Sequence, residues 1–80
     1  MHLQIHTIEE TLFEGEVEKI IAKTLTGEIT ILDGHIPIIT SLNGSLILYE
    51  KTGAQKTFML NGGTLVVQPQ SRVVILGDAM

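Results

Sequence analysis

The sequence predicts an all-β fold, a β-sandwich or barrel with essentially no helix. Apolar and polar residues alternate with a period of two over residues 2–7 and 46–51, as in half-buried strands. β-Branched residues dominate throughout, and tight-turn sequences recur at short intervals. No stretch of about ten residues has the apolar spacing of three and four that marks a helix. Strands joined by tight turns are typical of a sandwich or barrel.

The strands are assigned in order between the turns. The first covers residues 2–7, and the second lies within 16–25, where the alternation slips and a β-bulge near Lys19 is expected. Residues 28–32 form a short strand, and Pro37 starts or edges the next, residues 37–42. The predicted turns are Thr26-Gly27, Asp33-Gly34, the common hairpin sequence Asn43-Gly44, Thr52-Gly53-Ala54, Asn61-Gly62-Gly63 and Pro69-Gln70-Ser71.

Length and composition indicate one small domain, residues 1–80. The chain has 80 residues, of which 44% are hydrophobic, enough for a single small core. Its apolar runs are far too short to span a bilayer, and no signal-peptide pattern is present at the N-terminus. Without cysteine, a disulfide framework is excluded and a reducing, cytoplasmic setting is expected. We therefore expect a soluble domain that does not itself insert into a membrane.

The charge balance disfavours anionic partners. The formal net charge is -4, and the few basic residues are scattered and not interleaved with aromatic residues. Since phosphate neutralisation supplies most of the affinity in nucleic-acid complexes, we expect no nucleic-acid partner. The same balance disfavours anionic lipid, and the acidic residues of the first quarter are expected to form a solvated face.

The residues that could carry chemistry form no recognisable catalytic or metal site. His2 and His6 would lie roughly 13 Å apart on one strand face, whereas zinc ligands must come within about 2.1 Å of the ion. Glu16 and Glu18 share a face and lack the facing walls of a glycosidase pair. No serine lies in a Gly-x-Ser-x-Gly elbow, and no glycine cluster has phosphate-loop spacing. We expect no catalytic residue, no metal and no cofactor.

His35 stands at a corner, between the turn at Asp33-Gly34 and the strand that Pro37 begins. Proline fixes φ near about −65° there. An imidazole at such a corner can bond to neighbouring backbone with one nitrogen and face a partner with the other. A structural or interface role is therefore favoured over catalysis.

The residues around His35 resemble the signature of a known family. The segment Gly27-Glu28-Ile29-x-Ile31-Leu32-x-Gly34-His35-x-Pro37-Ile38-Ile39-Thr40 is similar to that of the epsilon subunit of F-type ATP synthases, called delta in mitochondria. Residues 12–18, 61–67 and 73–79 resemble further segments of the same family, in the same order. Each piece is short, but together they are specific and cover nearly the whole chain.

The resemblance implies a two-sheet β-sandwich of about nine or ten strands that performs no chemistry of its own. In that family the domain sits at the foot of the central stalk, joins the gamma subunit to the membrane c-ring and couples rotation to ATP synthesis. The implied place is peripheral, on the cytoplasmic face of the cell membrane, with membrane association only through the complex.

The resemblance also implies roles for individual positions. The positions implied to face the c-ring are Thr26, Glu28 and Ile29. Those implied to meet gamma are His35 and Thr40. The implied structural turns contain Gly34, Pro37, Gly62 and Gly63.

Some features differ from the family pattern. Asp33 stands where the family often has proline, and Asn43-Gly44 stands where lysine, proline and glycine are common. At residues 78–80 the family's second domain, a helical hairpin, would begin. A natural short form and a cut at the domain boundary both explain this ending. Because the family's inhibitory arm, and the ATP site that some members carry, belong to the hairpin, neither self-inhibition nor nucleotide binding is expected.

Another class of function stays open as the alternative, a free-standing β-sandwich module that binds a sugar or an acidic metabolite. Such a module needs aromatic residues on a concave face. The chain has only Phe13, Tyr49 and Phe58. A small β-sandwich enzyme, a third class, would need a nucleophile, a metal set or an acid/base pair.

Overall fold

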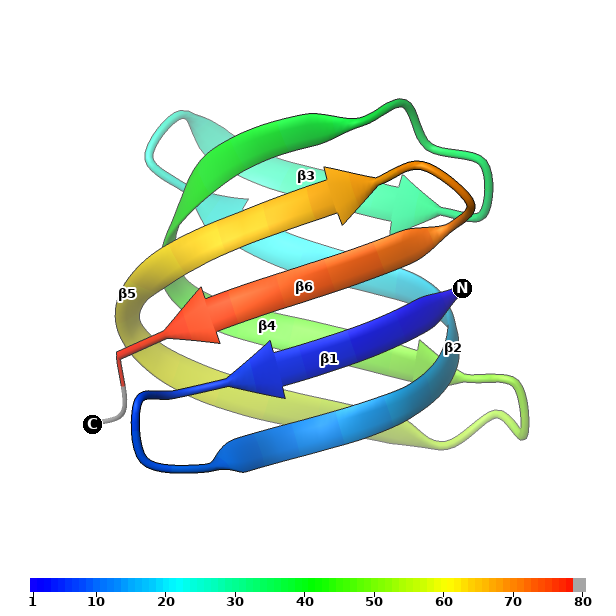
Figure 1. The fold of residues 1–80 in the computed structure, drawn as a ribbon, viewed down its shortest axis with the longest axis horizontal. Helices are drawn as coiled ribbons and strands as arrows, with labels where there is room; N and C mark the ends of the chain where they lie inside the picture. Colours follow the sequence, from blue (N-terminus) through cyan, green and yellow to red (C-terminus); the bar gives the residue numbers. More distant parts are fainter. Residues whose placement is uncertain (79–80) are drawn as a thin grey trace.

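The computed structural model describes residues 1–78, which form six β-strands and no helix (Figure 1). The strands are β1 (His2–His6), β2 (Thr11–Thr24), β3 (Gly27–Leu32), β4 (Ile38–Glu50), β5 (Gln55–Gln68) and β6 (Arg72–Gly77). This confirms the all-β class. Nothing in this part of the chain is a helix that could cross a membrane. The last positions of the expected domain, residues 79–80, lie outside the described residues.

The strands form one sheet that closes on itself. Its order is β1-β6-β5-β4-β2-β3, and an additional pairing of β1 with β2 closes it. The first part of β2, residues 11–16, pairs with β1, whereas residues 17–24 pair with β3 and β4. β4 and β5 are also long, and Figure 1 shows all three long strands curving around the molecule. The long strands thus contribute to both layers of a closed sandwich.

The strand number that the resemblance implied is therefore wrong as a count of continuous strands. The sheet has six strands, not nine or ten, because β2, β4 and β5 run through their bends without interruption. The two-layer arrangement survives, since each bent strand lies in one layer with its first part and in the other with its second.

The predicted hairpin turn at Asn43-Gly44 is also wrong. Both residues lie inside β4, where the register with β5 shifts between Leu42 and Gly44 and Gly44 has φ 112°. The strand keeps β5 as its neighbour on both sides of this point. The chain therefore forms no hairpin here: β4 bends at a bulge together with its partner β5, and the two strands curve from one layer into the other (Figure 1).

The expected turn at Asn61-Gly62-Gly63 is likewise a bend within β5. Gly62 and Gly63 have φ values of 130° and 149°, which favour glycine. A Cβ on Gly63 would collide with the carbonyl oxygen of Leu76, on the neighbouring strand β6. The glycines permit the bend and the close approach of two strands.

The bulge expected near Lys19 is confirmed. The register between β2 and β4 shifts between Val17 and Lys19. As a result Val17 and Ile20 both face the core, although they are an odd number of residues apart. The remaining predicted turns do reverse the chain, at residues 25–26, 33–34, 51–53 and 69–71.

The core between the layers is aliphatic. The side chains that are essentially removed from solvent come from every strand and include Leu3, Ile5, Val17, Ile20, Ile31, Leu46, Leu48, Leu65, Val73 and Ile75. Burial of such side chains stabilises the fold by about 1.5–3 kcal/mol each relative to exposure. With such a core, the turns and loops are free to carry function.

Candidate partner-docking site

The positions expected to face the c-ring lie on the hairpin of β2 and β3. Leu25 and Thr26 form its turn, and both are exposed. Glu28 is exposed on β3 and lies opposite Lys23 of β2. Ile29 is partly buried and packs against the core. Ile29 therefore anchors the hairpin, and Thr26 and Glu28 are the two of the three expected residues that a partner could reach freely.

His35 lies in the loop between β3 and β4, residues 33–37. Its backbone N–H donates to the carbonyl oxygen of Leu32 at 3.1 Å, and its Nδ1 lies 2.7 Å from the carbonyl oxygen of Ile36. A carbonyl oxygen only accepts, so Nδ1 carries the hydrogen of that bond. Nε2 makes no hydrogen bond with residues 1–78 and is available to a partner.

The same loop is tethered from two sides. The ammonium group of Met1 lies 2.8 Å from Oδ1 of Asp33. This hydrogen bond and the positive charge of the ammonium group lower the pKa of the Asp33 carboxyl below its ordinary value. On the other side, the N–H of Gly34 donates to Oγ of Ser71 at 3.2 Å, and Gly34 itself has φ 79°. The loop that carries His35 is thus held by the start of the chain and by the turn before β6.

Thr40, the second position expected to meet gamma, points toward the inside of the sandwich. It is partly buried and shares its strand face with the buried Leu42. Its neighbour Ile39 faces outward and is 75% exposed, and Ile36 in the loop is 71% exposed. A shallow apolar hollow lies here, lined by Pro37, Ile38, Ile39, Val66, Val67, Gln68 and Pro69.

Ile36 and Ile39 are the residues that sequence reasoning missed. The apolar run around Pro37 obscured the alternation, so no face was assigned to its isoleucines. The period of two, counted backward from Leu42, would have placed Ile39 on the outer face. No sequence signal of comparable strength marks Ile36.

The two groups of expected contact residues lie at opposite ends of β3. The β2–β3 turn precedes Gly27 and the β3–β4 loop follows Leu32. A strand of this length spans roughly 17 Å. Figure 1 shows the turn and the loop at opposite sides of the molecule. One rigid strand therefore connects two separate exposed surfaces.

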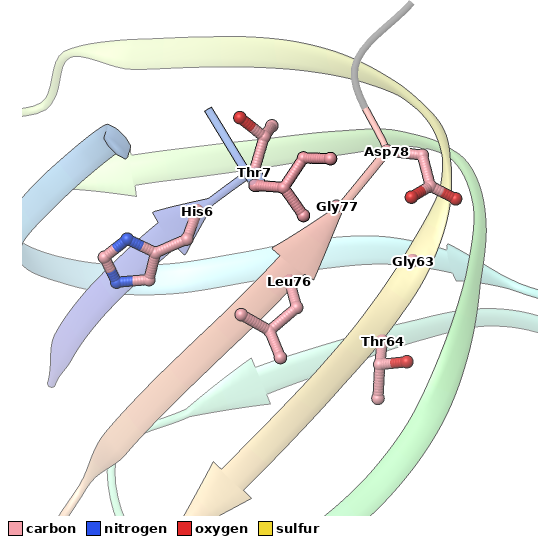
Figure 2. A pocket seen from close by; sticks show the side chains of 8 residues that line it. His6, Thr7, Gly63, Thr64, Leu76, Gly77 and Asp78 are labelled. Atoms are coloured by element: carbon pink, nitrogen blue, oxygen red, sulfur yellow. The ribbon is translucent and has the colours of Figure 1, made fainter. Parts of the chain in front are cut away.

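The histidine and acidic side chains elsewhere in the described chain do not come together in one site. Figure 2 shows a hollow beside the ends of β1 and β6, with His6 on one side of it and Asp78 on the other, and the two side chains do not point toward one another. Nδ1 of His6 is 3.0 Å from Oγ1 of Thr11. His2 lies between Glu14 and Glu16, at 3.3 and 3.1 Å. Residues 1–78 contain no group of three or more side chains that could hold a metal ion.

Comparison with known proteins identifies the family. The family model described as the beta-sandwich domain of the ATP synthase delta/epsilon chain matches residues 1–80. The chain belongs to this family. The resemblance drawn from the motif around His35 is thereby confirmed.

Individual members of the delta/epsilon family agree with this assignment. The ATP synthase epsilon chain of Psychrobacter arcticus is 36% identical over 81 residues, covering 100% of this chain and 59% of the relative. That of an Exiguobacterium species is 35% identical over 79 residues, covering 98% of this chain and 57% of the relative. The chain thus spans less than two thirds of the length of these relatives.

Solved structures show the same fold. A chain in the mitochondrial ATP synthase of Euglena gracilis, solved with OSCP, F1 and c-ring, matches with a TM-score of 0.88 at 26% identity, over 94% of this chain and 48% of that one. A chain from the central stalk and c-ring of the Tetrahymena thermophila enzyme matches with a TM-score of 0.79 over 96% of this chain and 62% of that one. At 20% identity, the second match supports the fold alone.

Proposed function

We propose that this chain is a non-catalytic subunit of the rotor stalk of an F-type ATP synthase. It docks the gamma subunit to the membrane c-ring and so couples rotation to ATP synthesis. Its family membership supports this, as does its likeness to a chain in a structure that contains F1 and c-ring. In this role it is peripheral to the membrane, on the cytoplasmic face, and is held there by the complex.

One geometric observation carries the proposal. The surface that carries Thr26 and Glu28 and the surface that carries His35 are separated by the whole length of β3. A subunit that transmits torque between two partners needs two contact surfaces on a stiff body. The closed sheet supplies the stiffness, because every strand except β3 has neighbouring strands on two sides. β3 pairs only with β2.

The surface beside His35 suits a large apolar partner face. Ile36 and Ile39 are exposed next to the apolar hollow, and His35 offers a free ring nitrogen at its border. Exposed apolar patches bordered by polar groups are typical of protein interfaces. We assign this surface to gamma and include Ile36 and Ile39 with His35. Thr40 supports it from the inner side.

The surface at the β2–β3 turn suits a polar partner loop. Thr26 and Glu28 are small or charged acceptors on an exposed edge. Contacts of this kind contribute specificity and association rate more than affinity. We assign this surface to the c-ring, with Ile29 as the anchor of the hairpin.

The alternative, a free-standing ligand-binding module, has less support. The aromatic residues that it would need are engaged with other side chains. Phe13 and Phe58 pack edge to face with their ring centres 6.2 Å apart, and Nζ of Lys19 lies 4.5 Å from the ring centre of Tyr49. None of these residues lines the apolar hollow near His35.

Cross-linking tests the proposal directly, because the chain contains no cysteine. Single cysteines are introduced as Thr26→Cys and Ile39→Cys in the assembled synthase, with Thr52→Cys in the β4–β5 turn as the control. We expect Thr26→Cys to cross-link to the c-ring, Ile39→Cys to gamma, and Thr52→Cys to neither. Exchanged partners would contradict the residue assignment, and failure to assemble with gamma and ring at all would contradict the function.

A further inference from the structure

The turn between β2 and β3 is not one that a two-residue hairpin favours by itself. Leu25 and Thr26 connect the paired residues Thr24 and Gly27. The favoured turns need a positive φ at the first turn residue or at both. Neither Leu25 nor Thr26 has a positive φ, and only the following Gly27 does, at 128°. The positive φ of this turn therefore falls on Gly27, directly after the two turn residues, and side-chain bonds can add support to the turn.

Thr24 provides this support through its side chain. It is 7% exposed and is the only buried polar residue in the described part of the chain. Its hydroxyl donates to the carbonyl oxygen of Gly27 at 2.7 Å and accepts from the N–H of Thr26 at 3.3 Å. The bond to the N–H two residues ahead is the hydroxyl version of a turn-stabilising side-chain bond. One buried hydroxyl thus connects both sides of the turn.

A third contact sets the direction of the Thr26 hydroxyl. The Oγ1 atoms of Thr24 and Thr26 are 3.3 Å apart. A hydroxyl has one hydrogen and two acceptor lone pairs. Since Thr24 uses its hydrogen on Gly27, the hydrogen of this third bond comes from Thr26. The Thr26 hydroxyl therefore points its hydrogen inward and presents acceptor lone pairs to the outside.

The exposed edge consequently has a defined chemistry. Thr26 offers lone pairs, and the carboxylate of Glu28 only accepts. Leu25, next to Thr26 in the turn, is 74% exposed. Acceptors beside one apolar tip are complementary to a loop that carries N–H donors.

We propose that Thr24 is the positioning residue of the c-ring contact: its buried hydroxyl holds the β2–β3 turn so that Leu25 and the Thr26 acceptor meet a donor-bearing loop of the ring. The identity of the partner rests on the proposed function. The effect of Thr24 on the turn does not.

The test uses the full chain with three substitutions. Thr24→Val keeps the shape and removes the hydroxyl, Thr24→Ser keeps the hydroxyl, and Thr30→Val changes an exposed threonine of β3 as the matched control. Three quantities are measured for each variant: hydrogen exchange at the Thr26 amide, the affinity for purified c-ring, and the affinity for gamma.

We expect Thr24→Val to speed exchange at the Thr26 amide and to weaken ring binding about five- to tenfold, the loss typical of about one hydrogen bond, with gamma binding unchanged. Thr24→Ser and Thr30→Val should both match the wild type in hydrogen exchange at the Thr26 amide and in ring affinity. Unchanged ring binding in Thr24→Val overturns the proposal, and so does an equal loss on ring and gamma, which would mark a purely structural role. If the wild type itself binds gamma and not the ring, the ring assignment of the proposed function is wrong. The c-ring is then also wrong as the partner of the turn that Thr24 holds.

Discussion

The two ends of β3 are held in different ways. At the β2–β3 turn, the support is local, because Thr24 bonds to residues two and three positions ahead. At the β3–β4 loop, the support is distant, because Asp33 contacts Met1 and Gly34 contacts Ser71, 37 residues away. The first is a property of four consecutive residues, and the second exists only in the folded chain.

This difference predicts how the two surfaces respond to perturbation. A locally supported turn keeps its shape until its own residues change. A loop held by distant tethers follows the state of the strands that carry those tethers, and local opening of the sheet edge releases it. Substitutions at the tethers should therefore affect the surface around His35 while the β2–β3 turn stays as it is.

The largest effect is expected from Ile39→Asp, which places a charge in the apolar surface next to His35. We expect the affinity for gamma to fall about 30-fold or more, as at an interface residue worth at least about 2 kcal/mol. Because Ile39 is 75% exposed, the free energy of unfolding should change by less than about 1 kcal/mol. Titration calorimetry and thermal unfolding measure the two quantities. Ile8→Asp, at the fully exposed Ile8, is the control, and equal losses for both variants would count against the assigned surface.

His35→Ala should have the next largest effect. It removes the bond to the Ile36 carbonyl and the free Nε2 from the surface that we assign to gamma. We expect a loss of about 1–3 kcal/mol in affinity for gamma and little change in the unfolding midpoint. His6→Ala on β1 serves as the control. If the midpoint collapses while the affinity holds, His35 acts in the fold and not at the interface.

Ser71→Ala tests the distant tether itself. It removes the hydroxyl that accepts from Gly34 and leaves the backbone of the turn before β6 with the same positive φ, 55° at Ser71. We expect a loss of about 0.5–1.5 kcal/mol in stability and faster hydrogen exchange at the Gly34 amide, without a change at Thr26. Ser41→Ala, at an exposed position of β4, is the matched control. Faster exchange at Thr26 as well would contradict the independence of the two ends.

The smallest effect is expected from pH, through the ion pair between the Met1 ammonium group and Asp33. The Met1 ammonium lowers the pKa of Asp33 in the folded chain, so the pair contributes stability above the unfolded pKa of about 4 and loses it as the pH falls through the folded pKa. Asp33→Asn removes this contribution. The difference in unfolding midpoint between the wild type and Asp33→Asn should shrink as the pH falls below about 4. A difference that persists at lower pH would show that the ion pair is not its origin, and Glu10→Gln controls for other exposed carboxylates.

Much of the fold follows from the sequence because its signals are local. The alternation of residues 2–7 and 46–51 places side chains on the two faces of a strand, and the slip near Lys19 marks a real bulge. Asp33-Gly34 and Thr52-Gly53 reverse the chain, as their residue types favour. The family signature around His35 could also be found without coordinates.

The outcome at two glycine sequences could not be foreseen in this way. Asn43-Gly44 and Asn61-Gly62-Gly63 have the residue types of turns, yet they bend strands that continue. Glycine permits a positive φ in either case. Whether the chain then forms a hairpin or bends within one strand depends on which strand lies beside it, and that neighbour is distant in sequence.

In the candidate site, too, some features depend on adjacent residues and others on the packing of distant strands. The sequence by itself predicted a turn at Thr26-Gly27, one residue from its place at Leu25-Thr26 in the structure. It also determined that His35 stands at a corner and that Glu28 is a charged residue on a short strand, because each depends on a few adjacent residues. Only the tertiary structure decided that Thr40 points inward, that Ile36 and Ile39 are exposed, and that Ser71 and Met1 hold the loop of His35. Exposure and long-range bonds are set by which strands pack together, and that packing is a property of the whole closed sheet and of no single segment.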